Sequence, residues 1–247
     1  MLSASAPSHR RNPRLLALDT ATERIAVALV DGDRQWLADE AGGALASQHL
    51  LPRVFALLGR AGLALADLDA IAFGRGPGAF TGLRSACSVA QGLAFGAGLP
   101  VLAIDSLALI AEDAFAQHPA SEIWVAMDAR MGQVYAAAYR RHGEHWQGLH
   151  APALWTLAAL AEAWRCQPPV CIAGSALEVF GPCLPTGAAP CIATPHDRAA
   201  ALARLARAAW QRGEGLDAAL ALPLYLRDKV ALTTAEREAA ALAKASA

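Results

Sequence analysis

The chain has 247 residues, which is enough for one large or two modest domains, and 55% of them are hydrophobic while 17% are charged. This composition excludes a disordered protein, and a formal net charge of −1 argues against a protein that binds tRNA or DNA without a partner. The five cysteines include no C-x-x-C pair, which favours reduced thiols over disulfides or a zinc site.

Two aspartate-bearing hairpins give the chain a repeated layout. An apolar strand over residues 15–18 ends in Asp19, and Thr20 begins a turn into a second strand. Later in the chain, an apolar strand over 123–127 runs into Asp128 and a second turn of the same kind. In both copies a helix, another strand and a glycine turn follow. This order predicts an internal duplication into two α/β halves, the layout of the actin, hexokinase and Hsp70 class.

The two aspartates have two candidate roles. In an active ATPase of this class the hairpins hold phosphates and a metal-bridging carboxylate, so Asp19 and Asp128 are candidates for that chemistry. Each could instead cap its own turn by accepting hydrogen bonds from backbone N–H groups. The first turn has no glycine, and the turn of the second half has only Gly174. These features favour the capping role. The degenerate nucleotide-site positions are Asp19, Thr20, Asp128 and Gly174.

A glycine-rich loop, GRGPGAFTGLR, follows a predicted strand at 69–73 and opens a helix near Thr81. Free N–H groups at the start of a helix can bind an anion. However, the loop has neither a GK[ST] ending nor a G-x-G-x-x-G pattern, so a tight turn with close backbone approach is favoured. The predicted structural loop consists of Gly74, Gly76, Pro77, Gly78, Thr81 and Gly82.

Two helices of the first half have more uncharged surface than a monomer needs. The face of helix 82–96 that points away from the sheet carries no charge beyond Arg84. The apolar arc of helix 47–60 covers roughly 160°, wider than one buried face requires. These two helix surfaces predict a helical protein–protein interface. The alternative interpretation is that the helices are core helices covered by the second half of the chain. The predicted interface residues are His49, Leu50, Val54, Leu57, Arg84, Ser85, Ser88, Gln91, Gly92 and Phe95.

Other signals for location and chemistry are weak. Residues 85–104 carry no charge, but four helix breakers interrupt them, which favours a helix followed by a strand over a membrane span. Cys87 lies inside this helix and is interpreted as a packing residue. No H-E-x-x-H, H-x-x-x-H or G-x-S-x-G pattern is present, and nothing specifies a reaction. We expect a soluble, cytoplasmic protein.

The predicted organisation has four parts. Residues 1–13 form a flexible N-terminus, and residues 14–105 form the first actin-like half. Residues 106–230 form the second half, which includes a linking helix. Residues 231–247 form a C-terminal helix or tail, where Thr233 and Glu236 are spaced as a capping box.

Several motifs together resemble one known family. The glycine loop with the AQGLA that follows it, the hairpin MDARMGQVY, the opening LALDTAT and the ending PLYLR are similar to the TsaB (YeaZ) family. The resemblance runs over about residues 15–230. It implies a duplicated actin-like (ASKHA, ribonuclease H-like) fold and a non-catalytic relative of the enzyme TsaD, with no active site or metal of its own.

The resemblance also implies partners and a pathway. Together with TsaE and ATP, this protein and TsaD would transfer a threonylcarbamoyl group from threonylcarbamoyl-AMP to the adenosine 3′ of the anticodon, in tRNAs that decode codons beginning with A. It would pair with TsaD through the first-half helices and meet tRNA through the complex, and it could also form a homodimer. ATP or ADP and metal are expected on TsaD and TsaE, and no membrane partner is expected.

One comparison with the catalytic relative concerns a metal pair. That enzyme carries an H-x-x-x-H pair on its first-half helix, whereas residues 46–52 contain only His49. A single imidazole holds a catalytic metal poorly, so His49 is interpreted as a helix-start or interface residue. The alternative function is an actin-fold, ATP-dependent small-molecule kinase that uses Asp19 or Asp128 as its base.

Overall fold

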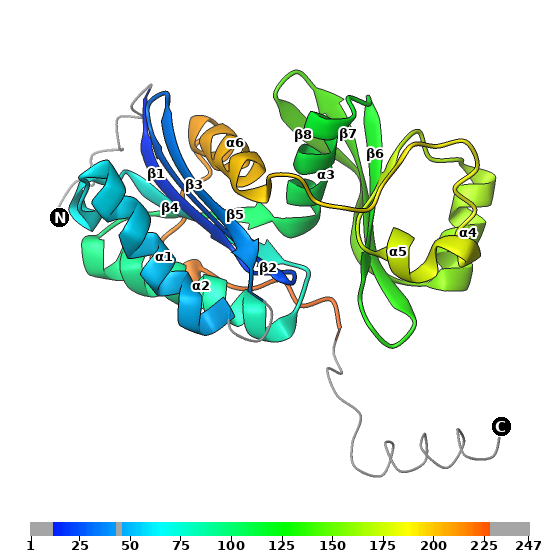
Figure 1. The fold of residues 1–247 in the computed structure, drawn as a ribbon, viewed down its shortest axis with the longest axis horizontal. Helices are drawn as coiled ribbons and strands as arrows, with labels where there is room; N and C mark the ends of the chain where they lie inside the picture. Colours follow the sequence, from blue (N-terminus) through cyan, green and yellow to red (C-terminus); the bar gives the residue numbers. More distant parts are fainter. Residues whose placement is uncertain (1–11, 43–45, 228–247) are drawn as a thin grey trace, which may run out of the picture.

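The computed structural model describes residues 12–42 and 46–227. Most of the predicted N-terminal segment and all of the predicted C-terminal helix or tail, residues 231–247, therefore lie outside the described residues. The described chain forms two five-stranded sheets that stand side by side (Figure 1). The first contains β1 (Arg14–Asp19), β2 (Arg24–Asp31), β3 (Arg34–Ala41), β4 (Ala70–Gly76) and β5 (Val101–Asp105). The second contains β6 (Glu122–Asp128), β7 (Gln133–His142), β8 (His145–Thr156), β9 (Ile172–Ala173) and β10 (Cys191–Ile192).

The two sheets have the same topology. The first has the order β3-β2-β1-β4-β5, and the second has the order β8-β7-β6-β9-β10. In each, the three hairpin strands are antiparallel, and the two later strands run parallel to the first strand of that half. The predicted duplication is therefore confirmed, and the fold is the actin-like α/β fold.

Helices cover the faces of both sheets. The α-helices are α1 (Ala46–Ala61), α2 (Phe80–Ala97), α3 (Ser106–Gln117), α4 (Leu157–Cys166), α5 (Ala176–Phe180) and α6 (Arg198–Gln211), with short 3-10 turns η2 (Leu65–Asp67), η3 (Gly181–Cys183) and η4 (Ala218–Leu220). Helices α1 and α2 pack on one face of the first sheet, while α3 and α6 lie between the two sheets (Figure 1). Leu160 and Trp164 of α4 pack on the outer face of the second sheet.

The last part of the chain returns to the first half. The alanine-rich side of α6 packs in the same cluster as β1, β2, β4 and β5. After α6, the C-terminal strap, residues 212–227, runs along the first half: Leu216 pairs with Val101 of β5, and Gln91 of α2 donates to the Ala218 carbonyl. The predicted division assigned residues 106–230 to the second half. In space, however, residues 198–225 complete the first, whereas Leu226 and Arg227 contact the second half.

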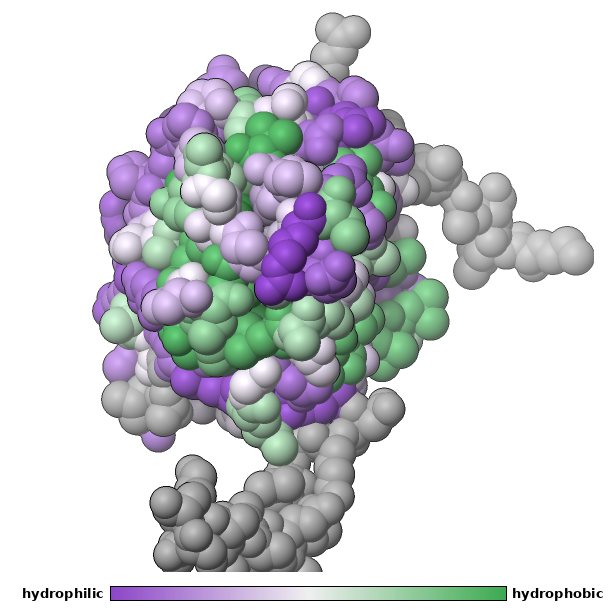
Figure 2. All heavy atoms as spheres, turned by 90° about the vertical axis from the view of Figure 1, so that its right-hand side faces the viewer, coloured by the Kyte–Doolittle hydropathy of each residue, from purple (hydrophilic) through white to green (hydrophobic). Residues whose placement is uncertain are grey.

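The uncharged stretch 85–104 is the end of α2 followed by β5, as predicted. Within the described ranges, no helix has both the length and the apolarity to cross a bilayer. The face of the second half that points away from the first has hydrophobic residues near its centre and hydrophilic residues around them (Figure 2). Val170 of this half is exposed.

The five free thiols divide into two groups by burial. Cys87 is a buried packing residue, as predicted, and Cys171 is fully buried, whereas Cys166, Cys183 and Cys191 are exposed. Burial raises the pKa of the Cys171 thiol to about 11 and also raises the pKa of Cys87. Because the thiolate is the nucleophile, we expect Ellman's reagent to modify the three exposed thiols quickly in the native protein and the two buried ones only after unfolding. Rapid reaction of all five without denaturant would contradict this assignment.

Asp105 links β5, α3 and β7. Its carboxylate caps α3 by accepting the backbone N–H of Leu107 at 2.9 Å, and it accepts the hydroxyl of Tyr139 at 2.7 Å. Burial raises the pKa of Asp105 above its ordinary value. The folded state therefore holds the proton more tightly than the unfolded state, so this group's contribution to stability falls as pH rises from about 3.9, the unfolded pKa, through the folded pKa.

Asparagine at this position should remove that pH dependence. Asp105→Asn keeps one acceptor oxygen for the cap, and its amide NH₂ can donate to the Tyr139 hydroxyl, but it cannot ionise. Urea unfolding of the wild-type protein and of Asp105→Asn across this pH range should show the free energy of unfolding of the variant rising relative to that of the wild type, and then levelling off above the folded pKa. If the free energy of unfolding of the variant instead fell relative to that of the wild type as pH rises, the fold would stabilise the charged form of Asp105.

Candidate functional site

The glycine loop is packed tightly against the turn of the first hairpin. A Cβ atom at Gly78 would lie 2.3 Å from the Ala21 carbonyl oxygen, and one at Gly82 would lie 1.9 Å from the Thr20 carbonyl oxygen. The Thr20 hydroxyl donates to the Gly82 carbonyl at 2.7 Å, and the N–H of Ala79 donates to the Ala21 carbonyl at 2.8 Å. The loop therefore uses its glycines, and one of its N–H groups, to bind the hairpin.

The same loop begins with a turn that requires glycine. Gly76 has a φ of 106°, a region that side chains rarely adopt, and it precedes Pro77. A Cβ atom at Gly74 would lie 1.7 Å from Asp19 Oδ2. Thr81, which is exposed, lies in the first turn of α2. The loop thus holds the start of α2 close to β1.

Asp19 is buried and already has its partners. It is 1% exposed, and its carboxylate accepts the Ser106 hydroxyl at 2.8 Å and the Ala21 N–H at 3.2 Å. The guanidinium of Arg198, itself 3% exposed, donates to it at 3.1 Å. Sequence reasoning missed Arg198, because its partner lies far away in the sequence. The buried ion pair leaves Asp19 closed to a phosphate or a substrate hydroxyl.

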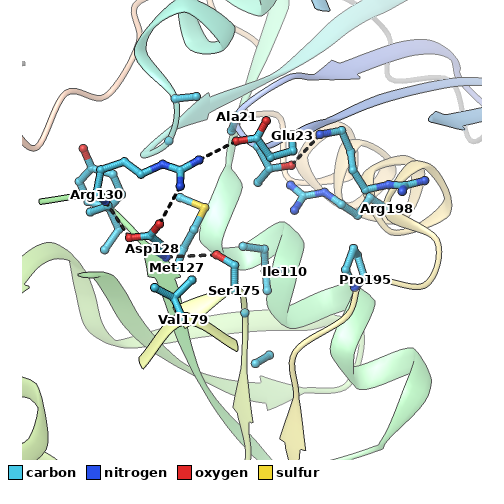
Figure 3. Close-up of a pocket in the computed structure, with 18 of the residues that line it drawn as sticks. Ala21, Glu23, Ile110, Met127, Asp128, Arg130, Ser175, Val179, Pro195 and Arg198 are labelled. Atoms are coloured by element: carbon cyan, nitrogen blue, oxygen red, sulfur yellow. Dashed lines mark hydrogen bonds and ion pairs between the residues drawn. The ribbon is translucent and has the colours of Figure 1, made fainter. Parts of the chain in front are cut away.

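Asp128 has a different environment at the tip of the second hairpin. Its carboxylate accepts the backbone N–H of Arg130 at 2.8 Å and pairs with the Arg130 guanidinium at 3.2 Å. Arg130 also reaches Glu23 of the first hairpin at 2.9 Å, so this ion pair joins the two halves (Figure 3). Gly174, with a φ of 115°, packs against the Ala126 carbonyl, where a Cβ atom would lie 2.4 Å away.

A cleft of about 540 Å³ lies between the halves. Both hairpin turns, α3, the start of α6, the end of β9 and the C-terminal strap surround it (Figure 3). Asp128, Gly174 and Arg198 line it, whereas Asp19 lies behind Arg198. The structure thus brings two of the four degenerate nucleotide-site positions, Asp128 and Gly174, to the wall of the cleft. Thr20 is buried in its turn, and Asp19 is covered by Arg198.

The cleft residues do not fit a nucleoside triphosphate with its metal. Four arginines are balanced by four carboxylates, and no lysine lines the cleft. Asp19 and Asp128 are held by Arg198 and Arg130, and the glycine loop is occupied by the first hairpin. Among the described residues, no three His, Cys, Asp or Glu side chains converge in a way that could hold a metal. Neither aspartate is therefore placed as the free base that a kinase requires.

For three residues of α1, the predicted place in the interface is wrong. Leu50, Val54 and Leu57 of α1 are buried against the first sheet, with exposed fractions of 2% or less. They belong to the core because the apolar arc of α1 is centred on the sheet. The side chains that extend this arc outward are Leu51 and Phe55, which are 38% and 49% exposed.

The other predicted interface residues lie at the surface. His49, Arg84, Ser88, Gly92 and Phe95 are exposed, while Ser85 and Gln91 are half-buried. Arg84 lies over the Phe80 ring at 3.7 Å and donates to the Tyr225 hydroxyl at 3.1 Å. The strap therefore packs beside α2.

The strap adds apolar side chains that local sequence patterns did not reveal. Leu220, Leu222 and Tyr225 are 62%, 71% and 43% exposed. The motif PLYLR drew attention to Tyr225, but no local sequence pattern indicated that this side chain contacts α2. We define the docking face as a subset of the exposed residues of α1, α2 and the strap, which leaves out exposed charged residues of the same elements such as Arg53 and Arg60: His49, Leu51, Phe55, Arg84, Ser88, Gly92, Phe95, Leu220, Leu222 and Tyr225.

Comparison with known proteins gives consistent matches. A family model described as TsaD, tRNA N6-adenosine threonylcarbamoyltransferase, matches residues 44–172. The tRNA threonylcarbamoyladenosine biosynthesis protein TsaB of Haemophilus influenzae is 46% identical over 125 residues, which are 51% of this chain and 53% of that protein. TsaB of Escherichia coli is 41% identical over 145 residues, which are 56% and 63% of the two chains.

The chain thus spans between about half and two thirds of the length of these curated relatives. A solved structure, YeaZ from Pseudomonas aeruginosa, is similar over a longer range. It shares 41% identity with a TM-score of 0.78, and the match covers 87% of this chain and 100% of that one. From this full-length match and the shared duplicated fold, we conclude that the chain belongs to the TsaB (YeaZ) family.

Proposed function

We propose that the protein is an accessory subunit in the biosynthesis of threonylcarbamoyladenosine in tRNA, and that it acts in the cytoplasm by docking to TsaD. The observation that carries this proposal is the docking face, which brings exposed leucine, phenylalanine and tyrosine side chains of α1, α2 and the strap together with the arginine Arg84. Phe95 is 77% exposed, and α2 packs against both α1 and the η4 turn of the strap. Exposed apolar side chains gathered on adjoining elements mark protein–protein contacts. The names of the curated relatives supply the pathway.

In this proposal the protein contributes structure and the partners contribute chemistry. Docking orders the active site of TsaD, while TsaE, ATP or ADP and metal belong to the partners. The threonylcarbamoyl group then passes to the adenosine 3′ of the anticodon in tRNAs that decode codons beginning with A. The near-neutral charge of the chain supports a role in which tRNA is held by the complex. The same face would also serve a homodimer when TsaD is absent.

A charge placed on the docking face tests the proposal. Gly92 is exposed with no atom within 4 Å of its would-be Cβ, so Gly92→Glu and the neighbouring Ser88→Arg should leave the fold intact. Each would bury an unpaired charge in the complex, and we expect the affinity for TsaD to fall by at least about tenfold. Calorimetry with purified TsaD measures the binding, and mass spectrometry of tRNA from a complemented strain measures the modification.

A matched control comes from the other half of the molecule. Val170→Glu also adds a charge to an exposed apolar position, but on the second half, away from α1 and α2. We expect this variant to bind TsaD and to restore threonylcarbamoyladenosine as the wild type does. If TsaD binding survives both Ser88→Arg and Gly92→Glu, or fails only in the control, the docking face is misplaced.

A further inference from the structure

The cleft between the halves has the size and the lining of a small-molecule site. Its volume of about 540 Å³ lies within the range of roughly 300–1,000 Å³ that is usual for such sites. Apolar side chains from both halves form much of its wall, including Leu83, Ile110, Met127, Val179, Ile192 and Leu224. A ligand here would therefore need an apolar body.

The acidic groups around the cleft already have hydrogen-bond partners. Glu23 and Asp128 share the guanidinium of Arg130 (Figure 3). Asp113 accepts two backbone N–H groups at the start of α6, at 2.9 and 2.8 Å. Glu178 accepts a threonine hydroxyl at 3.5 Å. Glu23, Asp113 and Asp128 are therefore held by groups of the protein itself, while Glu178 has only this one long contact.

Unused hydrogen-bond donors, in contrast, remain at the cleft. Arg198 lies beside the Ala21 turn (Figure 3); its Nη2 binds Asp19, but its buried Nε has no partner among the described residues. Arg227 donates only to two backbone carbonyls and to the Met131 sulfur, and within the described ranges it has no carboxylate partner. Among the described residues, the hydroxyl of Tyr135 has no hydrogen-bond partner; this side chain is 8% exposed and lines the cleft.

We propose that the cleft binds a small molecule that has an apolar body and a single carboxylate, with Arg198 as the main anchor of the carboxylate. An unpaired buried guanidinium N–H favours an anionic acceptor, because leaving it unpaired costs free energy. The lining holds four arginines and four carboxylates, and Asp19 and Asp39 pair with two of these arginines from outside it. A ligand with one negative charge therefore meets less repulsion here than a multiply charged one. A triphosphate would instead face four carboxylates with no lysine and no open glycine loop.

Two compounds that differ only in the charge of one group test the proposed class of ligand. The full chain is titrated with 4-phenylbutyrate, with its uncharged amide 4-phenylbutyramide and with magnesium ATP, and binding is followed by calorimetry and by NMR shifts. We expect the acid to bind at least about tenfold more tightly than the amide, since a charge-assisted hydrogen bond contributes about 1.5–3 kcal/mol. Magnesium ATP should bind more weakly than the acid.

Variants of the cleft then locate the site. The double substitution Asp19→Asn with Arg198→Met replaces the buried ion pair by neutral groups, and it should abolish the preference for acid over amide. Val179→Trp, at a 53% exposed position on the cleft wall, should weaken both compounds. Arg165→Gln on α4, away from the cleft, should bind both as the wild type does.

Three results would overturn the proposal: no binding of either compound up to millimolar concentration, equal binding of acid and amide, or an unchanged preference in the double variant. Tighter binding of magnesium ATP than of the acid would also overturn it. The docking variant Gly92→Glu should retain the preference for the acid, because it lies outside the cleft. The ligand site and the proposed docking function can therefore fail separately.

Discussion

Gly82→Ala is expected to destabilise the fold severely. The added Cβ atom would lie 1.9 Å from the Thr20 carbonyl oxygen, which belongs to the backbone of the first hairpin and is fixed by β1 on one side and β2 on the other. Helix α2 would have to move away from the sheet, and Leu83 and Ala86 would leave the core. We expect a loss of at least about 3 kcal/mol in the free energy of unfolding, measured by urea denaturation.

Gly92→Ala on the same helix is the control. No atom lies within 4 Å of its would-be Cβ, and the position is exposed. Since alanine has the higher helix propensity, this change should stabilise the protein by about 0.5–1 kcal/mol. Similar unfolding midpoints for the two variants would show that the contact between loop and hairpin does not hold α2 in place.

Arg198→Met should be the most damaging change at the cleft. It leaves the carboxylate of Asp19 at 1% exposure without its counter-charge, and breaking a buried pair in this way typically costs about 3–5 kcal/mol. Adding Asp19→Asn should restore most of this loss, because the asparagine needs no counter-charge and can still accept the Ser106 hydroxyl. Thermal and urea unfolding of the two single variants and the double variant give the coupling energy. Additive losses would contradict a direct pair.

Local patterns predicted the repeated architecture well. The run of apolar residues into Asp19, and the similar run into Asp128, each lie within a few positions of the turn that they open. The strand after each helix is also a short apolar run followed by a glycine. These features depend only on residues that are close in the sequence, so they can be predicted without knowing how the sheets assemble.

Contacts between distant residues could not be predicted in the same way. The apolar arc of α1 included Leu50 and Leu51, and only the packing against the sheet shows that the first is buried and the second exposed. Arg198 and Asp19 are 179 positions apart, so no local spacing pairs them. The candidate site was accordingly found only in part, because the cleft joins residues from both hairpins and the strap.

The return of α6 to the first sheet affects how the protein can fold as it is synthesised. All five strands of the first sheet are complete by Asp105, yet the apolar face made by Leu15, Ala28 and Leu102 is covered mainly by α6, with Leu109 of α3 at the same cluster. A ribosome-bound chain must therefore keep that face exposed while the whole second half is made. The half that emerges first should mature last, and the chain depends on its final helix to become a single cooperative unit.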